Sequence, residues 1–343
     1  MPPSEVLLGG VLVVALVLYF LFGGADFGGG VWDLLARGPR RDAQRAAIEH
    51  ALGPVWEPNH VWLILVIVVL FTAFPRAFAQ LATGLFVPLT LFLLGIVLRG
   101  SAFSFRALDH AGGAAQRRWG RVFSIASAVS PFLLGAMVAA IASGRVAAGH
   151  QGDWLSAFAF ACGTLALALA AFLAATYLTV EVADPALRDD FRRRALCAGV
   201  AAGVAAGVAF LLSRDAAPRL YAALSARPTT WPFHAVTAGA ALGALAALWQ
   251  RRFRLARVLA AAQVSLVIVG WAASQYPYLV PPELTLVAAA APPRTRALLL
   301  IVLAGGVPVL APSLVILFRV FKRAPRPHPG ASRGPSRGER PAP

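Results

Sequence analysis

Charged side chains are scarce in this sequence: only 13% of its 343 residues are Asp, Glu, Lys or Arg, while 59% are hydrophobic. A typical soluble domain carries about a quarter charged residues, so the composition excludes a water-soluble globular protein and indicates an integral membrane protein. Acidic residues are scarcer than basic ones, with 15 Asp and Glu against 31 Lys and Arg. We expect no nucleic acid as a partner despite the net charge of +16, because the basic residues lie in short segments between apolar runs.

Cysteine is almost absent as well. The two cysteines, Cys162 and Cys197, each lie within an apolar run and show no metal-binding spacing, so we expect packed thiols and no metal site. The amino-terminal segment lacks the basic stretch and the small-residue cleavage site of a signal peptide. Its apolar run is long enough to cross a bilayer, so we expect it to be retained as the first transmembrane helix.

Long apolar runs dominate what is present. A membrane-spanning helix needs about 20 mostly apolar residues, and nine stretches meet or approach that length: residues 6–25, 58–75, 77–98, 121–143, 154–180, 195–213, 230–250, 257–277 and 297–319. The predicted fold class is an all-α polytopic membrane protein with nine transmembrane helices, which form a membrane domain over residues 1–322. The tail, residues 323–343, is rich in Arg, Pro, Gly and Ser, so we expect it to be disordered, basic and drawn to anionic membrane lipid.

The basic residues predict the orientation of this multi-pass protein. Most of them follow the first, third, fifth and seventh stretches or lie in the tail, and the other side carries only Arg76, Arg145, Arg214, Arg219, Arg227, Arg294 and Arg296. Because cytoplasmic loops carry the excess of Lys and Arg, we expect the C-terminus in the cytoplasm and the N-terminus outside.

One segment, Pro54–Trp62, sets a carboxylate, an amide, an imidazole and two indoles against an apolar run. Its acid, Glu57, lies where the second helix leaves water and enters lipid. A charge at the bilayer centre costs roughly 2.5 to 3.5 kcal/mol and less near the interface, so Glu57 needs a partner, a water path or a function. The alternative is a carboxylate stabilised by the positive end of its helix, with Trp56 and Trp62 as interfacial anchors.

Two further charges lie inside apolar stretches. Asp26 is surrounded by glycines, and an acid among closely packed glycines needs an explanation that packing does not supply. Arg99 ends the third stretch, and the topology places it at the cytoplasmic side with Asp26 and Glu57. Arg99 can pair with either acid, or the acids can form a proton entry path with Asn59 and His60. Position alone does not separate a structural ion pair from a relay.

These residues also carry a family resemblance. Together, Gly24–Gly30, Pro54–Ile64, Leu70–Pro75, Arg99–Gly100 and Phe103–Arg106 resemble subunit II of the cytochrome bd type quinol oxidases. Further segments resemble the branch often called cyanide-insensitive: Ala175–Leu178, Tyr276–Pro282, Pro312–Leu314 and Phe318–Lys322. The likeness therefore extends from the first predicted helix to the ninth.

The resemblance implies a non-haem subunit of nine helices, built as two four-helix bundles plus one peripheral helix, in the bacterial cytoplasmic (inner) membrane. Its partner is a larger homologous subunit that carries haem b, haem d and the quinol site, and a small single-helix subunit can complete such complexes. The complex oxidises ubiquinol or menaquinol at the outer face, reduces dioxygen to water and takes protons from the cytoplasm. This chain would contribute assembly, a proton route and an oxygen route, with no catalytic residue, cofactor or metal of its own.

The resemblance also assigns roles to residues. Asp26, Glu57 and Arg99 fall on the family's charged positions, and the motif includes Trp56, Asn59 and Trp62. The proton-path candidates are Glu57, Asp26, Asn59 and His60, with Arg99 as their structural charge partner, while Trp56 and Trp62 border an oxygen route or pack. Two positions depart from the family: Glu57 stands where many members have Asp, and Pro58 where many have Gly. Glutamate keeps the acid but lengthens its reach.

Two other classes of protein are alternative hypotheses for this sequence. A secondary transporter also needs membrane carboxylates and glycine-rich breaks, but such proteins usually contain paired repeats, and the sequence shows none. A cytochrome that binds its own haem needs histidines within the membrane, and only His60 and His234 are placed near it. His60 also occupies a variable position of the family motif, which weakens a role as a haem ligand.

Overall fold

The computed structural model describes residues 3–52, 56–108, 114–146, 153–225 and 230–321, without the side chains of 52, 56–58, 106–108, 114–117 and 317–321. The chain divides into two units, Met1–Leu303 and Ala304–Pro343. The second unit contains the end of the last helix, and the tail expected to be disordered, residues 323–343, lies outside the described residues.

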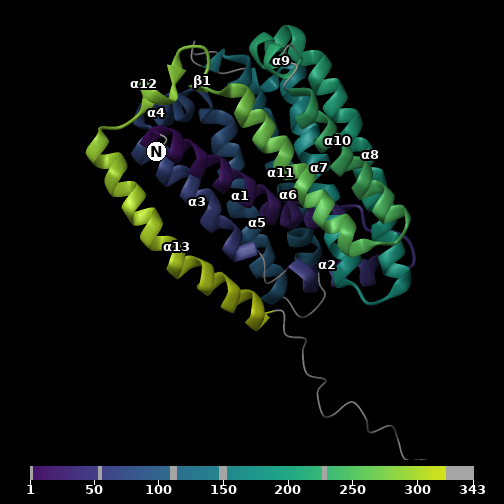
Figure 1. Cartoon of the computed structure of the whole chain (residues 1–343). Helices are drawn as coiled ribbons and strands as arrows, with labels where there is room; N and C mark the ends of the chain where they lie inside the picture. The colour runs from purple at the N-terminus through teal and green to yellow at the C-terminus, as the bar shows by residue number, and fades with distance from the viewer. Residues whose placement is uncertain (1–2, 53–55, 109–113, 147–152, 226–229, 322–343) are drawn as a thin grey trace, which may run out of the picture. The chain divides into compact units, whose positions relative to one another are not determined.

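Helices make up nearly all of the described chain (Figure 1). In order they are α1 Ser4–Leu34, α2 Arg41–Leu52, α3 Trp56–Ala73, α4 Pro75–Gly84, α5 Phe86–Leu108, α6 Ala114–Ser143, the 3₁₀ turn η3 Asp153–Leu155, α7 Ala157–Glu181, α8 Pro185–Ala216, α9 Pro218–Ser225, α10 Thr230–Trp249, α11 Phe253–Gln275, the strands β1 Tyr278–Val280 and β2 Leu284–Thr285, α12 Leu286–Ala289 and α13 Pro293–Phe321. Among the described residues, eight helices are long and apolar enough to cross a membrane, and the bent pair α3 and α4 makes a ninth when counted as one span. The predicted all-α polytopic membrane fold is confirmed, and the grouping into two bundles and a peripheral helix stays a prediction.

The predicted boundary of the third span was wrong. We expected one helix over residues 77–98, but Pro75–Gly84 forms the separate helix α4, bent by 119° from α3, and the third span begins only at Phe86. Pro75 is the first residue of α4, where a missing N–H costs nothing and the fixed φ suits a new helix. The bend therefore starts where a proline can begin a helix but cannot continue the previous one.

Helix α1 runs unbroken through its glycine-rich segment, although glycine is a poor helix former. Close packing explains why it is tolerated. A side chain at Gly28 would collide with the Ala170 carbonyl of α7 and lie 2.7 Å from the Cβ of Ala174. Helix α1 thus lies directly against α7, whose own residues Phe172 and Leu178 are fully buried in the largest hydrophobic cluster.

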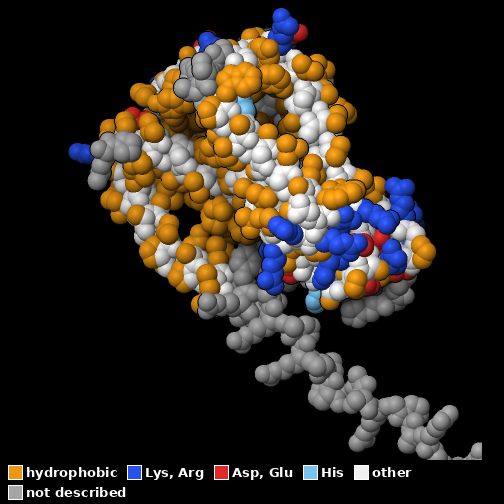
Figure 2. All heavy atoms as spheres, turned by 45° about the vertical axis from the view of Figure 1, so that its right-hand side comes forward, with side chains coloured by type: hydrophobic (Ala, Val, Ile, Leu, Met, Phe, Trp, Pro, Cys, Tyr) orange, Lys and Arg blue, Asp and Glu red, His pale blue; other side chains and the backbone are white. Residues whose placement is uncertain are grey.

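One end of the first unit is rich in arginine, with Arg37–Arg45, Arg188–Arg194 and Arg251–Arg257 lying close together; we call it the arginine-rich end. Figure 2 shows basic side chains gathered there beside a largely apolar surface. Arg40 donates to Asp190 at 2.6 and 2.8 Å, which joins the start of α2 to α8. These hydrogen bonds raise the pKa of the Arg40 guanidinium. The end where α1 begins carries the β1–β2 hairpin, α4 and α12, packed on Leu8 and Phe74.

Candidate functional site

A buried ion pair lies between α1 and α5. Asp26 is 1% exposed and Arg99 is 3% exposed, and the Nη2 of Arg99 donates to the Oδ1 of Asp26. Each buried charge carries a desolvation penalty of several kcal/mol, which a well-placed partner offsets. Of the two partners that the sequence left open for Arg99, the structure pairs it with Asp26.

The guanidinium of Arg99 is held on several sides. Its Nε donates to the hydroxyl of Ser127 at 2.9 Å, and this hydroxyl in turn donates to the Phe123 carbonyl at 2.7 Å. Its central carbon lies 5.2 Å from the ring centroid of Phe27 and 4.9 Å from that of Phe123, within the range of cation–π attraction. Gly30 leaves the room for Ser127, because a side chain at Gly30 would overlap it. Arg99 is therefore fixed in one position.

A second buried acid, Asp33, lies seven residues after Asp26 and was missed by the sequence analysis. It is 2% exposed and accepts a hydrogen bond from Ser124 at 2.8 Å, while the Nε of Arg45 lies 3.6 Å from its carboxylate. A spacing of seven residues returns to the same face of a helix. That spacing is the signal in the sequence that identifies Asp33 as a companion of Asp26.

The same spacing leads back from Asp26 to Tyr19. Tyr19 and Asn59 are each 1% exposed. Among the described residues, the Tyr19 hydroxyl, the Asn59 amide and the Oδ2 of Asp26 have no hydrogen-bond partner. Asn59 lies directly against α1, since a Cβ at Gly23 would be 2.5 Å from its Nδ2. Buried polar atoms normally have partners, so this group of atoms needs an explanation.

We call this set of residues the polar seam: Tyr19, Asp26, Asp33, Asn59, Arg99, Ser124 and Ser127. It follows one face of α1 from Arg45 at the arginine-rich end toward the middle of the helix. Steps of seven residues along a helix measure about 10 Å, so proton movement along the seam needs water between the acids. The seam offers alternating acids and hydroxyls rather than the ligands of a metal.

The other predicted site residues lie on α3. The side chains of Glu57 and Trp56 lie outside the described residues, although the helix begins at Trp56, next to the segment expected to enter lipid. His60 is half-buried beside Asn59. Trp62 packs with the cluster that contains Tyr19.

The two histidines considered as haem ligands do not come together. His60 lies in the second turn of α3, which starts at the arginine-rich end, whereas His234 lies near the start of α10 at the opposite end (Figure 1). The Nε2 of His234 is 2.9 Å from the Leu224 carbonyl. These two residues cannot be the axial ligands of one haem. Among the described residues, no three His, Cys, Asp or Glu side chains are grouped to hold a metal ion.

An apolar cavity of about 350 Å³ lies beside the inner end of the polar seam. Its lining comes from helices α1, α6, α7, α8, α9, α10 and α11 and includes Tyr19, Phe20, Leu169 and Trp271. The cavity wall is mostly hydrophobic, so it suits a small apolar guest rather than an ion.

Comparisons with known proteins agree on one family. The family model described as cytochrome bd terminal oxidase subunit II matches residues 4–321. The chain is 31% identical over 128 residues to the cytochrome bd ubiquinol oxidase subunit 2 of Bacillus subtilis (strain 168), covering 37% of each protein. It is 29% identical over 133 residues to the cytochrome bd-I ubiquinol oxidase subunit 2 of Escherichia coli (strain K12), covering 38% of this chain and 32% of that protein. These matches therefore span only about a third of the relatives' own length.

A solved structure shows the same fold. The chain resembles a chain of the bd oxidase from Geobacillus thermodenitrificans with a TM-score of 0.78 and 22% identity, covering 94% of this chain and 99% of that chain. At this identity the likeness concerns the arrangement of the helices alone.

Proposed function

We infer that this chain, which belongs to the cytochrome bd terminal oxidase subunit II family, is one subunit of a quinol oxidase in the bacterial inner membrane. Its partner is a larger subunit that carries haem b, haem d and the quinol site, and the complex couples quinol oxidation to the reduction of dioxygen to water. The names of the relatives include both ubiquinol and menaquinol oxidases, so either quinol fits. These comparisons do not support the alternative hypothesis of a secondary transporter.

Within this complex, the polar seam brings protons from the cytoplasm toward the partner. The buried Asp33 carries this proposal, because it lies on α1 between Asp26 and the partly exposed side chain of Arg45. Arg45 and Ser124 both contact its carboxylate and hold it in place. Arg99 balances the charge of Asp26 and leaves its Oδ2 as the atom that can exchange a proton. Asn59 and Tyr19 extend the seam inward. Glu57, whose side chain lies outside the described residues, is a further acid of the proposed route. The distribution of basic residues supports a cytoplasmic arginine-rich end.

Oxygen access is the second contribution of this chain. The apolar cavity beside Tyr19 and the packed Trp62 offer dioxygen a route without ionic groups. Assembly with the larger subunit is the third, and it needs no chemistry in this chain.

The proton route is tested in the complex reconstituted into vesicles. Replacing Asp33 by Asn or Glu57 by Gln or Ala removes an acid from the path, so quinol-driven proton uptake and oxygen consumption should slow by about tenfold or more. Glu57→Asp keeps an acid and should stay close to the parent rate. Asp42→Asn is the control, because Asp42 is an exposed acid of α2 at the same end. Near-normal rates in all of the variants would remove the relay and leave these acids a structural role.

A further inference from the structure

The turn between α10 and α11 presents arginines on a rigid backbone. The N–H groups of Arg251 and Arg252 donate to the carbonyls of Leu248 and Ala247 at 3.2 and 2.8 Å and close the end of α10. Arg251 has a φ of 60°, a left-handed conformation that helix ends usually reserve for glycine. Because this position holds an arginine instead of a glycine, the turn carries a basic side chain that lines the cavity described next.

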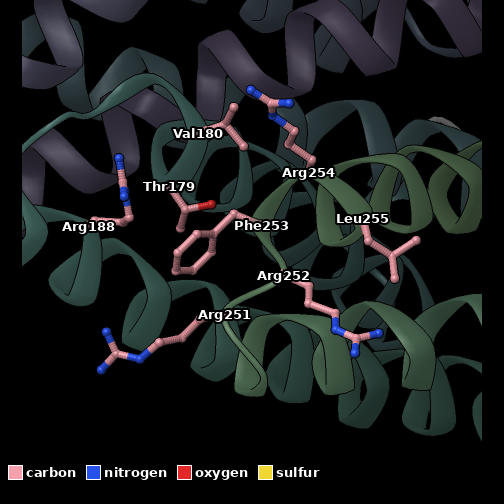
Figure 3. A pocket seen from close by; sticks show the side chains of 8 residues that line it. All are labelled: Thr179, Val180, Arg188, Arg251, Arg252, Phe253, Arg254 and Leu255. Carbon is pink, nitrogen blue, oxygen red and sulfur yellow. The ribbon is translucent and has the colours of Figure 1, made fainter.

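Next to this turn lies a cavity of about 540 Å³, formed by the end of α7, the start of α8 and the first turn of α11; we call it the arginine cavity. It is lined by Thr179, Val180, Arg188, Arg251, Arg252, Phe253, Arg254 and Leu255. Figure 3 shows the four arginine side chains on different sides of Phe253 and Thr179, with their guanidinium groups directed outward rather than at one point. Arginine forms paired hydrogen bonds with phosphate and carboxylate groups, which makes it the usual residue for binding them.

Acids balance only part of the charge of the arginine cavity. Arg188 is anchored to the Val182 carbonyl at 2.8 and 3.2 Å and lies 5.8 Å from the Phe253 ring centroid. Arg251 pairs with Asp189 at 3.0 Å. Within the part of the chain that the structure describes, neither Arg252 nor Arg254 has an acidic partner. The cavity therefore keeps an excess of positive charge.

Exposed apolar side chains of α10 and α11 lie near the cavity in the sequence and beside its lining residue Leu255. Trp249 is 71% exposed, Leu255 is 46% exposed and Val258, one turn further along α11, is 65% exposed. Figure 2 shows basic side chains next to apolar ones at this end of the first unit. A ligand that fits both features carries an anionic phosphate and long apolar chains.

We propose that the arginine cavity binds the phosphate headgroup of an anionic phospholipid, whose acyl chains lie along Leu255 and Val258. Basic pockets between membrane helices recognise such headgroups through charge and hydrogen bonds. The exposed side chains of Arg252 and Arg254 turn toward the phosphate when it binds. Arg188 is fixed by its hydrogen bonds to the Val182 carbonyl, and Arg251 by its ion pair with Asp189. The site is separate from the polar seam and does not depend on the redox role of the complex.

Native mass spectrometry of the purified complex, titrated with phosphatidylglycerol in neutral detergent, tests this site. Phosphatidylcholine with the same acyl chains is the lipid control. A near-surface basic residue strengthens the binding of anionic lipid about fivefold, so Arg252→Gln with Arg254→Gln should weaken phosphatidylglycerol binding roughly thirtyfold. The matched control is Arg37→Gln with Arg41→Gln, which removes the same charge from exposed residues at the same end and should leave the binding unchanged.

Several outcomes would overturn the proposal. Equal losses in both double variants would mean diffuse attraction to the whole arginine-rich end, and equal binding of the two lipids would exclude recognition of the headgroup charge. Complete displacement of the lipid by millimolar inorganic phosphate would assign the cavity to a soluble anion. If the double variant does not assemble, the single variants Arg252→Gln and Arg254→Gln should each lose about fivefold, and an unchanged affinity in both would overturn the proposal.

Discussion

At the scale of single residues, the ion pair between Asp26 and Arg99 allows two charged side chains to be buried between the helices. Asp26 alone would be an isolated carboxylate among helices, and Arg99 alone an isolated guanidinium between two aromatic rings. Together they are neutral, and Ser127 satisfies a further donor of Arg99. The pair can thus be structural and still leave one carboxylate oxygen of Asp26 for proton exchange.

A double-mutant cycle separates the pair from its single members. Asp26→Asn or Arg99→Gln should each destabilise the complex by about 3–5 kcal/mol, because each leaves one buried charge without its partner. The double variant should lose much less than the sum of the two. The thermal denaturation midpoint of the detergent-solubilised complex measures the effect.

The control for that cycle is Glu181→Gln, which breaks the partly exposed pair with Arg257. Such surface pairs contribute about 0–1 kcal/mol. Additive losses in the Asp26 and Arg99 variants, or losses no larger than that of Glu181→Gln, would show that the two charges are not coupled.

At the scale of secondary-structure elements, the glycines of α1 set how closely the helices approach. Gly28 lies against the backbone of α7, and Gly23 lies against Asn59 of α3. These contacts bring α1 near enough for its acids to meet Arg99 and Ser124 on the neighbouring helices. The glycine-rich segment therefore builds the seam as well as the packing.

Two alanine substitutions on α1 test this packing. Gly28→Ala should destabilise the complex by about 1–3 kcal/mol, because the new methyl group collides with the Ala170 carbonyl. Gly10→Ala on the same helix meets no atom within 4 Å and should be neutral or stabilising, since alanine favours helix by about 1 kcal/mol over glycine. The thermal midpoint and the yield of assembled complex provide the measurement. Equal effects at both positions would contradict a role for close packing at Gly28.

The sequence predicted the spans better than the details that position the seam. Apolar length identifies each membrane helix, but it does not reveal that Pro75 starts a bent helix and moves the third span to Phe86. Asp33 was not singled out from the sequence, because the hydrogen bond that it accepts from Ser124 joins residues that are 91 positions apart in the chain. Ser124 and Ser127 lie three residues apart on α6, a spacing that acquires meaning only once Asp33 of α1 and Arg99 of α5 are known to lie against them.

At the scale of the whole molecule, the described arginines without an acidic partner are more numerous at the arginine-rich end than at the end where α1 begins, where they are Arg76, Arg214, Arg219 and Arg294. At the end where α1 begins, Arg296 pairs with Glu5, Arg145 lies 3.4 Å from Asp153, and Arg219 donates to the Pro282 carbonyl at 3.3 Å. At the arginine-rich end, Arg252 and Arg254 have no acidic partner among the described residues. The difference in free positive charge supports the proposed orientation, with the entrance of the polar seam in the cytoplasm.

The proposed division of roles between this chain and a larger partner subunit yields the last prediction. The placement of His60 and His234 at opposite ends removes the histidine pair that a haem in this chain would most readily use. A reduced-minus-oxidised spectrum should therefore show haem bands for the complex and none for this chain purified alone. His60→Ala and His234→Ala should keep the bands of the complex, even where His60→Ala slows proton uptake. Bands from the isolated chain, lost in either variant, would place a haem here and make the histidine concerned its ligand.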